Sequence, residues 1–154
     1  MLLSENLGAL AEFRREAWEF QQTFETPLKK LQAFVSTIVS AGEQWRTANV
    51  TLELVVFEPQ HLIALLKENS IPPSYERGVT LTAKGQKEIE ALLCAVLQDW
   101  IDFVCVPEPE SFAIYADHDE FTTIYAHSRS DLNRVTEVLL RKGFKPEPNY
   151  TRQL

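Results

Sequence analysis

The sequence predicts an α+β fold: a small antiparallel sheet of about three strands, including a C-terminal β-hairpin, packed against four to five helices. Three observations support this prediction. Residues 89–104 carry apolar side chains at helical spacing. Residues 50–57 are rich in β-branched side chains, which is typical of a strand. Residues 111–127 hold two arms rich in aromatic and threonine residues around an Asp-His-Asp turn, which is typical of a hairpin.

The length indicates a single domain over residues 1–154, with residues 145–154 as an extended tail that contains two prolines. A domain of this size buries roughly 68–70% of its unfolded surface. It therefore needs neither a disulfide nor a metal ion to fold.

The N-terminal quarter is predicted to be helical. Ser4 is the expected N-cap of a first helix that runs to about Glu25, and Thr26-Pro27 begins a second helix that stops at Gly42. The apolar residues of the first helix recur at spacings of three and four. They are Leu10, Phe13, Ala17, Phe20 and Phe24.

The middle of the chain is predicted to hold a strand and two helices. The strand over residues 50–57 precedes a short helix over residues 59–67 and a loop over residues 69–79. Thr82 is the expected N-cap of the long helix, which continues through Val104 until proline residues end it.

The last part of the chain is predicted to form the hairpin and a final helix. The two arms cover residues 111–117 and 120–127. The helix then begins at Ser128 or Ser130 and ends at Gly143.

One short segment resembles a known family. Residues 79–85 (VTLTAKG) are similar to the L-T-x-x-G segment at the strand end and helix start of winged-helix regulators. The match covers about seven residues, and no recognition helix precedes it. The resemblance implies a shared way of entering a helix, and we carry over no functional residue from that family.

Composition narrows the class of partner. The net charge of −7 and the pI near 5.0 oppose binding to nucleic acid or to an anionic membrane, and they favour a basic protein partner. Neither a signal peptide nor a membrane-spanning segment is expected, which predicts a cytoplasmic location. Cys94 and Cys105 are expected near or on the long helix, about 16 Å apart and too far for a disulfide.

Motifs of known catalytic sites are missing from the sequence. There is no G-x-S-x-G elbow, no H-E-x-x-H pair, no C-x-x-C and no phosphate-binding glycine loop. Glu108 and Glu110 flank Pro109, where carboxylates in an exposed connection are expected to be solvated. We therefore predict no catalytic residue, no metal ligand and no cofactor, and we favour a protein that is not an enzyme.

The hairpin tip is the first candidate site. Asp117, His118, Asp119 and Glu120 offer oxygen and imidazole groups that suit a divalent cation, but successive residues of a tight turn point in different directions. We therefore interpret them as a partner-binding surface. His127 lies at the far end of the second arm, and His61 belongs to the short helix.

Aromatic residues next to arginine are the second candidate. Trp45 precedes Arg46, and Tyr75 lies two residues before Arg77. Trp, Tyr and Arg are enriched at binding hot spots, so Trp45 and Tyr75 join the predicted partner-binding residues.

Two functional hypotheses follow. The first is a non-catalytic protein-binding module, of which an immunity- or antitoxin-type inhibitor or an adaptor is a concrete form. A second copy of the chain is an alternative partner, because the stripe of residues 10–38 is close to heptad spacing. The second hypothesis is a small enzyme or metal-dependent protein whose site is at the hairpin tip, with Asp117, His118, Asp119 and His127.

Overall fold

A computed structural model describes residues 1–16, 18–109 and 111–153. Within these residues the chain forms an α+β fold with a seven-stranded antiparallel sheet and five α-helices. The strand order is β1-β4-β3-β5-β6-β7-β2. The strands are β1 (Leu2–Glu5), β2 (Phe20–Glu25), β3 (Thr47–Leu54), β4 (Val79–Lys84), β5 (Asp102–Glu108), β6 (Phe112–Ala116) and β7 (Phe121–Ala126).

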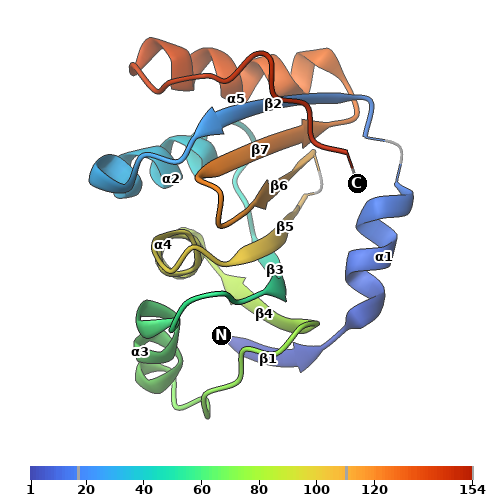
Figure 1. Cartoon of the computed structure of the whole chain (residues 1–154). Coiled ribbons are helices and arrows are strands. Elements are labelled where there is room, and N and C mark those ends of the chain that lie inside the picture. Colours follow the sequence, from blue (N-terminus) through green and yellow to red (C-terminus); the bar gives the residue numbers. More distant parts are fainter. Residues whose placement is uncertain (17, 110, 154) are drawn as a thin grey trace.

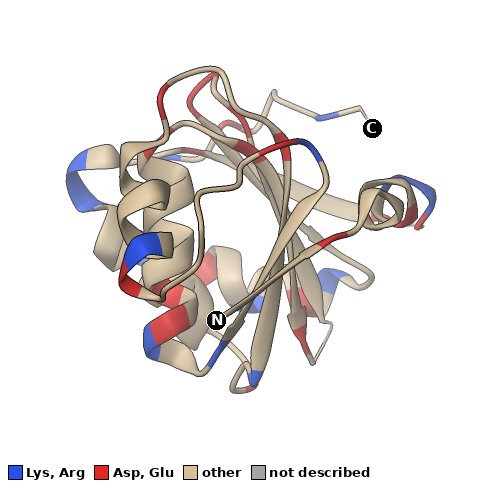
Figure 2. Cartoon of the chain, turned by 90° about the horizontal axis from the view of Figure 1, so that it is seen from below, with Lys and Arg blue, Asp and Glu red and all other residues tan. Residues whose placement is uncertain are grey.

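The helices lie on both faces of the sheet. Four helices cover one face, and α1 lies alone on the opposite face (Figures 1 and 2). The main core fills the space between the sheet and the four helices, and a smaller cluster lies under α1. The helices are α1 (Leu7–Arg15), α2 (Leu31–Ser40) with a preceding 3₁₀ turn (Leu28–Lys30), α3 (Gln60–Glu68), α4 (Gln86–Gln98) and α5 (Arg129–Arg141).

The predicted sheet of about three strands is wrong, because it omits β1, β2, β4 and β5. The first helix expected over residues 4–25 is a strand, a helix and a second strand. Phe20 and Phe24 explain the error, since residues four apart share a face in a strand as well as in a helix. Ala17, which belonged to the predicted stripe, lies outside the described residues.

The long helix predicted through Val104 ends at Gln98. Trp100 adopts a left-handed backbone conformation with φ of 56°, which turns the chain into β5. The predicted N-cap Thr82 lies inside β4, and Gly85 holds the N-cap position with φ of 79°. The apolar run after Trp100 fits a buried strand as well as a helix, and pairing with β3 decides between them.

The hairpin and the last helix were predicted correctly. β6 and β7 pair in antiparallel register, and the Ser128 side chain caps α5 by accepting a hydrogen bond from the Asp131 backbone amide at 3.1 Å. Gly143 follows the helix with φ of 87°. Both features depend on local capping and turn chemistry.

The two edges of the sheet differ. At the β2 edge the tail runs alongside, with the Glu25 amide donating to the Lys145 carbonyl at 2.9 Å and the Glu147 amide donating to the Thr23 carbonyl at 2.8 Å. At the other edge, β1 pairs only with β4 in the described part of the chain. None of the described helices has the length and apolar character needed to cross a bilayer.

Candidate functional site

The sheet face under α1 carries a row of residues that all bear a hydroxyl group except Val104. Register places one residue of each strand in a line across the whole sheet. Alternating side chains of a strand point to the same face, so these residues share the α1 side. In strand order they are Ser4, Thr80, Thr51, Val104, Tyr115, Thr123 and Thr23.

Helix α1 crosses the strands and divides this face (Figure 1). Leu10 and Phe13 bury their side chains in a small cluster with Val104 and Tyr115. The Phe13 ring stacks on the Tyr115 ring with centroids 6.2 Å apart. One polar site lies on each side of the helix.

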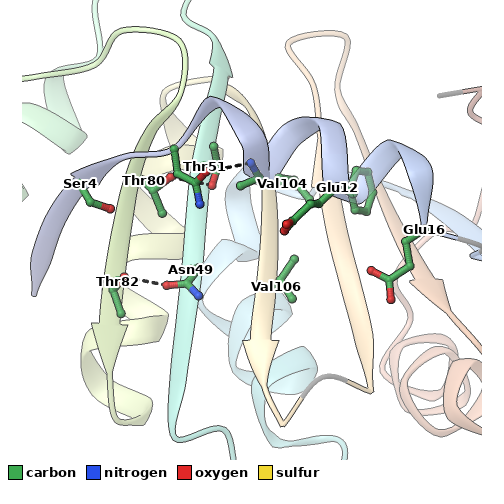
Figure 3. Close-up of a pocket in the computed structure, with 12 residues that line it drawn as sticks. Ser4, Glu12, Glu16, Asn49, Thr51, Thr80, Thr82, Val104 and Val106 are labelled. Carbon is green, nitrogen blue, oxygen red and sulfur yellow. Dashed lines mark hydrogen bonds between the residues drawn. The ribbon is translucent and has the colours of Figure 1, made fainter.

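The first site is a pocket of about 330 Å³ between α1 and strands β1, β4, β3 and β5, which we call the open pocket. Figure 3 shows its floor of threonine, asparagine and valine side chains beneath the helix. Twelve residues line it: Ser4, Asn6, Ala9, Glu12, Phe13, Glu16, Asn49, Thr51, Thr80, Thr82, Val104 and Val106.

Hydrogen bonds between neighbouring strands organise the floor of the open pocket. The hydroxyls of Thr51 and Thr80 lie 2.9 Å apart, and the Thr82 hydroxyl donates to the Asn49 side-chain oxygen at 2.6 Å. Each pair lies directly opposite in the β3–β4 register. The strands hold these groups at fixed spacing, as a recognition surface requires.

The charge of the open pocket is negative. Glu12 of α1 and Glu16, the residue that follows its last turn, both line the pocket, and Figure 3 shows Glu12 pointing toward the sheet and Glu16 farther along, at the end of the helix. The Glu16 carboxylate lies 3.1 Å from Nε2 of His127, whose ring stacks on Trp18. The Glu12 carboxylate makes no hydrogen bond or ion pair within the described residues. The twelve lining residues include no lysine, arginine or histidine, so the pocket suits a cationic group.

The second site holds the side chain of Arg152 from the tail, and we call it the arginine site. Nη1 of Arg152 lies 2.6 Å from Oδ2 of Asp117, and Nε donates to the Thr123 hydroxyl at 3.2 Å. The guanidinium carbon lies 4.6 Å from the centroid of the Tyr115 ring and 5.4 Å from that of Tyr150. The side chains of Arg152 and Asp117 are 9% and 8% exposed.

Glu53 joins the arginine site to α1. It occupies a register shift between Leu52 and Leu54, where β3 bulges against β5. Its carboxylate accepts a hydrogen bond from the Tyr115 hydroxyl at 2.5 Å and pairs with Arg14 of α1. Burial raises the pKa of Tyr115 to about 12, so the phenol stays protonated and donates to Glu53 at neutral pH.

The four predicted residues of the hairpin tip have separate roles. Oδ1 of Asp102 accepts hydrogen bonds from the backbone amide and from Nδ1 of His118, both at 2.8 Å. This hydrogen bond, with the charges of Asp102, Asp119 and Asp117, raises the pKa of His118. Asp117 faces the arginine site, while Asp119 and Glu120 are exposed. The tip therefore does not gather its four side chains around one point.

The three histidines do not converge. His118 pairs with Asp102, His127 with Glu16, and His61 with Asp99 through Nδ1 at 2.7 Å. Asp99 also accepts the backbone amides of His61 and Leu62, so it caps the start of α3. No group of three or more acidic, histidine or cysteine residues in the described ranges is placed to hold a metal ion.

The two predicted aromatic residues lie in different environments. Trp45 is 2% exposed and its ring packs 5.3 Å from that of Phe112, so it belongs to the core and not to a partner-binding surface. A loop tryptophan that caps the core gives the same sequence signal as an exposed one. Tyr75 is 36% exposed, in the segment before β4.

The two cysteines and the carboxylates beside Pro109 are the remaining candidates from the sequence. Cys94 lies on α4, but Cys105 lies on β5 and not on the long helix, and both are free. Burial raises the pKa of Cys94 to about 11 and that of Cys105 to about 12, which disfavours the reactive thiolate. Glu108 forms an ion pair with Arg46 at 2.9 Å, and Glu110 lies outside the described residues.

Sequence reasoning missed the open pocket and Arg152. One signal was present, because polar residues alternate with apolar ones at Asn49 and Thr51 and again at Thr80 and Thr82. Alternation of this kind indicates strands with one polar face. The strand order that brings the two segments together has no local signal.

Comparison with protein-family models, with curated protein sequences and with solved structures finds no match to this chain. The function is therefore inferred from the geometry of the site.

Proposed function

We propose that this protein is a non-catalytic binding module that takes a basic segment of a protein partner into the open pocket. The observation that carries the proposal is that two carboxylates, of Glu12 and Glu16, line the same pocket as the hydroxyl and amide groups of its floor. A lysine or arginine side chain of a partner supplies the charge that these carboxylates complement, and the floor accepts its hydrogen bonds.

The two carboxylates differ in what they offer a partner. Both are exposed, but the Glu16 carboxylate lies against the His127 ring, whereas Glu12 has no ion-pair partner in the described residues. Glu12 is therefore the principal attachment point for a cation. Glu16 adds a second carboxylate to the lining, and His127, stacked on Trp18, lies 3.1 Å from it at the end of α1.

The floor supports a binding function more than a reaction. Thr51 and Thr80 hydrogen-bond to each other, and no hydrogen bond within the described residues joins either hydroxyl to the Glu12 or Glu16 carboxylate that would have to activate it. Val104 and Val106 add an apolar strip on which the methylene groups of a lysine or arginine can pack.

The net charge of −7 supports the same class of partner. Long-range attraction speeds the encounter with a basic protein. An inhibitor of the immunity or antitoxin type, or an adaptor, is a concrete form of this function. Asp119 and Glu120 at the hairpin tip are exposed and add to the negative charge of the surface.

A short peptide with two lysines tests the proposal. The blocked pentapeptide Gly-Lys-Gly-Lys-Gly should bind the wild-type protein with a dissociation constant on the order of 0.1–1 mM at low salt, measured by calorimetry. Glu12→Gln should weaken this binding about fivefold, because it removes the charge of the carboxylate that has no ion-pair partner in the described residues. Raising the salt concentration should reduce the difference in affinity between the wild type and Glu12→Gln, because salt screens the attraction between the charges.

Glu137→Gln is the matched control, because Glu137 is an exposed carboxylate on α5, in the layer on the opposite face of the sheet. It should bind the peptide as the wild type does. Equal affinities of the wild type and Glu12→Gln, or equal binding of Gly-Glu-Gly-Glu-Gly, would contradict the proposal.

A further inference from the structure

We infer that the arginine site is a second recognition site, specific for a guanidinium group, and that Arg152 is its built-in occupant. An arginine side chain of a protein partner takes the place of Arg152 when the tail moves away. This site lies across α1 from the open pocket and uses different residues, so the inference goes beyond the proposed function.

The receptor half of the site does not depend on the tail. Asp117 follows β6, Tyr115 lies on β6, and Thr123 lies on β7. The hydrogen bonds of the hairpin hold all three in place. Oδ1 of Asp117 is fixed by the backbone amides of Asp119 and Phe121, at 2.9 and 3.3 Å, which leaves Oδ2 directed at the guanidinium.

The receptor matches the shape of a guanidinium group as well as its charge. Asp117 accepts a hydrogen bond from Nη1 of Arg152, and Thr123 accepts one from Nε. The Tyr115 ring supplies a flat surface beneath the guanidinium group. A planar cation can stack and hydrogen-bond at once, which a lysine ammonium cannot do. The geometry therefore selects arginine over lysine.

Arg152 leaves part of the site unused. Its Nη2 is buried without a hydrogen-bond partner among the described residues, and so is the Tyr125 hydroxyl. An unpaired buried donor weakens the hold of the tail on the site. A partner arginine that enters from a different direction is free of the tail's geometry, so its guanidinium can also hydrogen-bond to the Tyr125 hydroxyl.

The tail is attached in a way that permits exchange. Near Arg152, its backbone is held by the Gln21 side chain, which accepts from the Arg152 amide at 2.9 Å and donates to the Arg152 carbonyl at 3.2 Å. Thr151 and Gln153 on either side are exposed. Tyr150 of the tail also stacks on Phe121 with ring centroids 4.6 Å apart, and its hydroxyl donates to Oδ2 of Asp117 at 3.5 Å. A competitor reaches the site only in the fraction of molecules in which these contacts are open, and its apparent affinity scales with that fraction.

The test uses the full chain with Arg152→Ala and N-ethylguanidinium as the probe. The substitution should empty the site while the receptor residues remain. NMR titration should then show binding with a dissociation constant on the order of 1–10 mM, as expected of so small a ligand, reported by the Thr123 methyl and the Tyr115 ring. The wild type should bind the probe at least about tenfold more weakly, because Arg152 competes.

Two controls establish specificity. Adding Asp117→Asn to Arg152→Ala should abolish probe binding, because the amide keeps an oxygen for the turn but removes the charge. N-propylammonium should bind Arg152→Ala several-fold more weakly than N-ethylguanidinium does. Arg152→Lys is the second variant, and the probe should displace its lysine more readily than it displaces the wild-type arginine.

The inference is overturned if Arg152→Ala binds N-ethylguanidinium no better than the wild type does. It is also overturned if Asp117→Asn leaves the binding unchanged. In both cases Arg152 serves only to fasten the tail. Because the reporters lie away from the open pocket, neither result bears on the lysine peptide and the proposed function.

Discussion

The two sides of α1 hold carboxylates in opposite states. Asp117 is buried and paired with a guanidinium of the same chain, whereas Glu12 is exposed and has no ion-pair partner in the described residues. Each shares its site with hydroxyl groups of the same row across the sheet, Thr123 in one case and Thr51 and Thr80 in the other. Burial thus separates an acidic group that is paired within the fold from one that is open to solvent.

The difference has a physical basis. A buried charge has lost its hydration, so the removal of its partner leaves an uncompensated charge and strongly destabilises the protein. An exposed carboxylate keeps its water, and its loss changes stability little. Stability measurements should therefore separate the two sites even before any ligand is known.

Asp117→Ala should have the largest effect, a loss of about 3 kcal/mol in the free energy of unfolding. It removes the partner of Arg152 and two hydrogen bonds that the hairpin turn donates to Oδ1. Urea unfolding measures the change. Asp119→Ala is the control, because that side chain is 73% exposed and its loss should cost less than about 0.5 kcal/mol. Similar losses of unfolding free energy for Asp117→Ala and Asp119→Ala would show that the buried pair with Arg152 does not stabilise the fold more than an exposed carboxylate does.

Tyr115→Phe should cost about 1–2 kcal/mol, because it deletes the hydrogen bond to the partly buried Glu53. Tyr75→Phe is the matched control, since the Tyr75 hydroxyl makes no hydrogen bond in the described chain. The same urea experiment applies to both. A cost for Tyr115→Phe no greater than that of Tyr75→Phe would show that Glu53 is satisfied without the phenol.

The effect of His118 should depend on pH. Its folded-state pKa is raised by the hydrogen bond to Asp102, so the stabilisation is fully present below the unfolded pKa of about 6.5 and is lost as the pH rises through the folded value. His118→Gln should therefore destabilise the protein more at pH 6 than at pH 8. NMR titration should also show that Asp102→Asn lowers the pKa of His118. A pH-independent cost of His118→Gln would contradict the assigned role of this pair.

Glu12→Gln should have the smallest effect on stability, within about 0.5 kcal/mol of zero, because the side chain is exposed. Thermal or urea unfolding checks this expectation. A loss above about 1 kcal/mol would mean that Glu12 serves the fold, and the contrast with Asp117 would fail.

The sequence predicted the elements whose signals are local. The capping residue Ser128, the stop at Gly143 and the turn residues of the hairpin each act within a few positions. The four missed strands lacked such signals. Phe20 and Phe24 fit either periodicity, and the apolar run through Val104 fits a helix as well as a strand.

The candidate site was predicted less well than the fold, because its parts come together only through tertiary structure. Glu12 of α1 lines one pocket together with Thr51 of β3 and Thr80 of β4, which are far from it and from each other in sequence. Asp117 was selected as acidic, but nothing in the sequence pairs it with Arg152, which lies 35 residues later. Trp45 was selected for exposure that the packing of Phe112 removes.

The claim that the open pocket binds a cationic side chain can be tested by one NMR titration of the wild-type protein with n-butylammonium. The methyl signals of Thr51, Thr80, Val104 and Val106 report on the open pocket, and that of Thr123 reports on the arginine site. We expect saturable shifts of the methyl signals of the open pocket, and we expect Glu12→Gln to weaken this binding. The Thr123 signal should not change, because Arg152 fills the arginine site. If the open-pocket signals did not shift, or if the shifts were concentrated at Thr123, the open pocket would not be the cation-binding site.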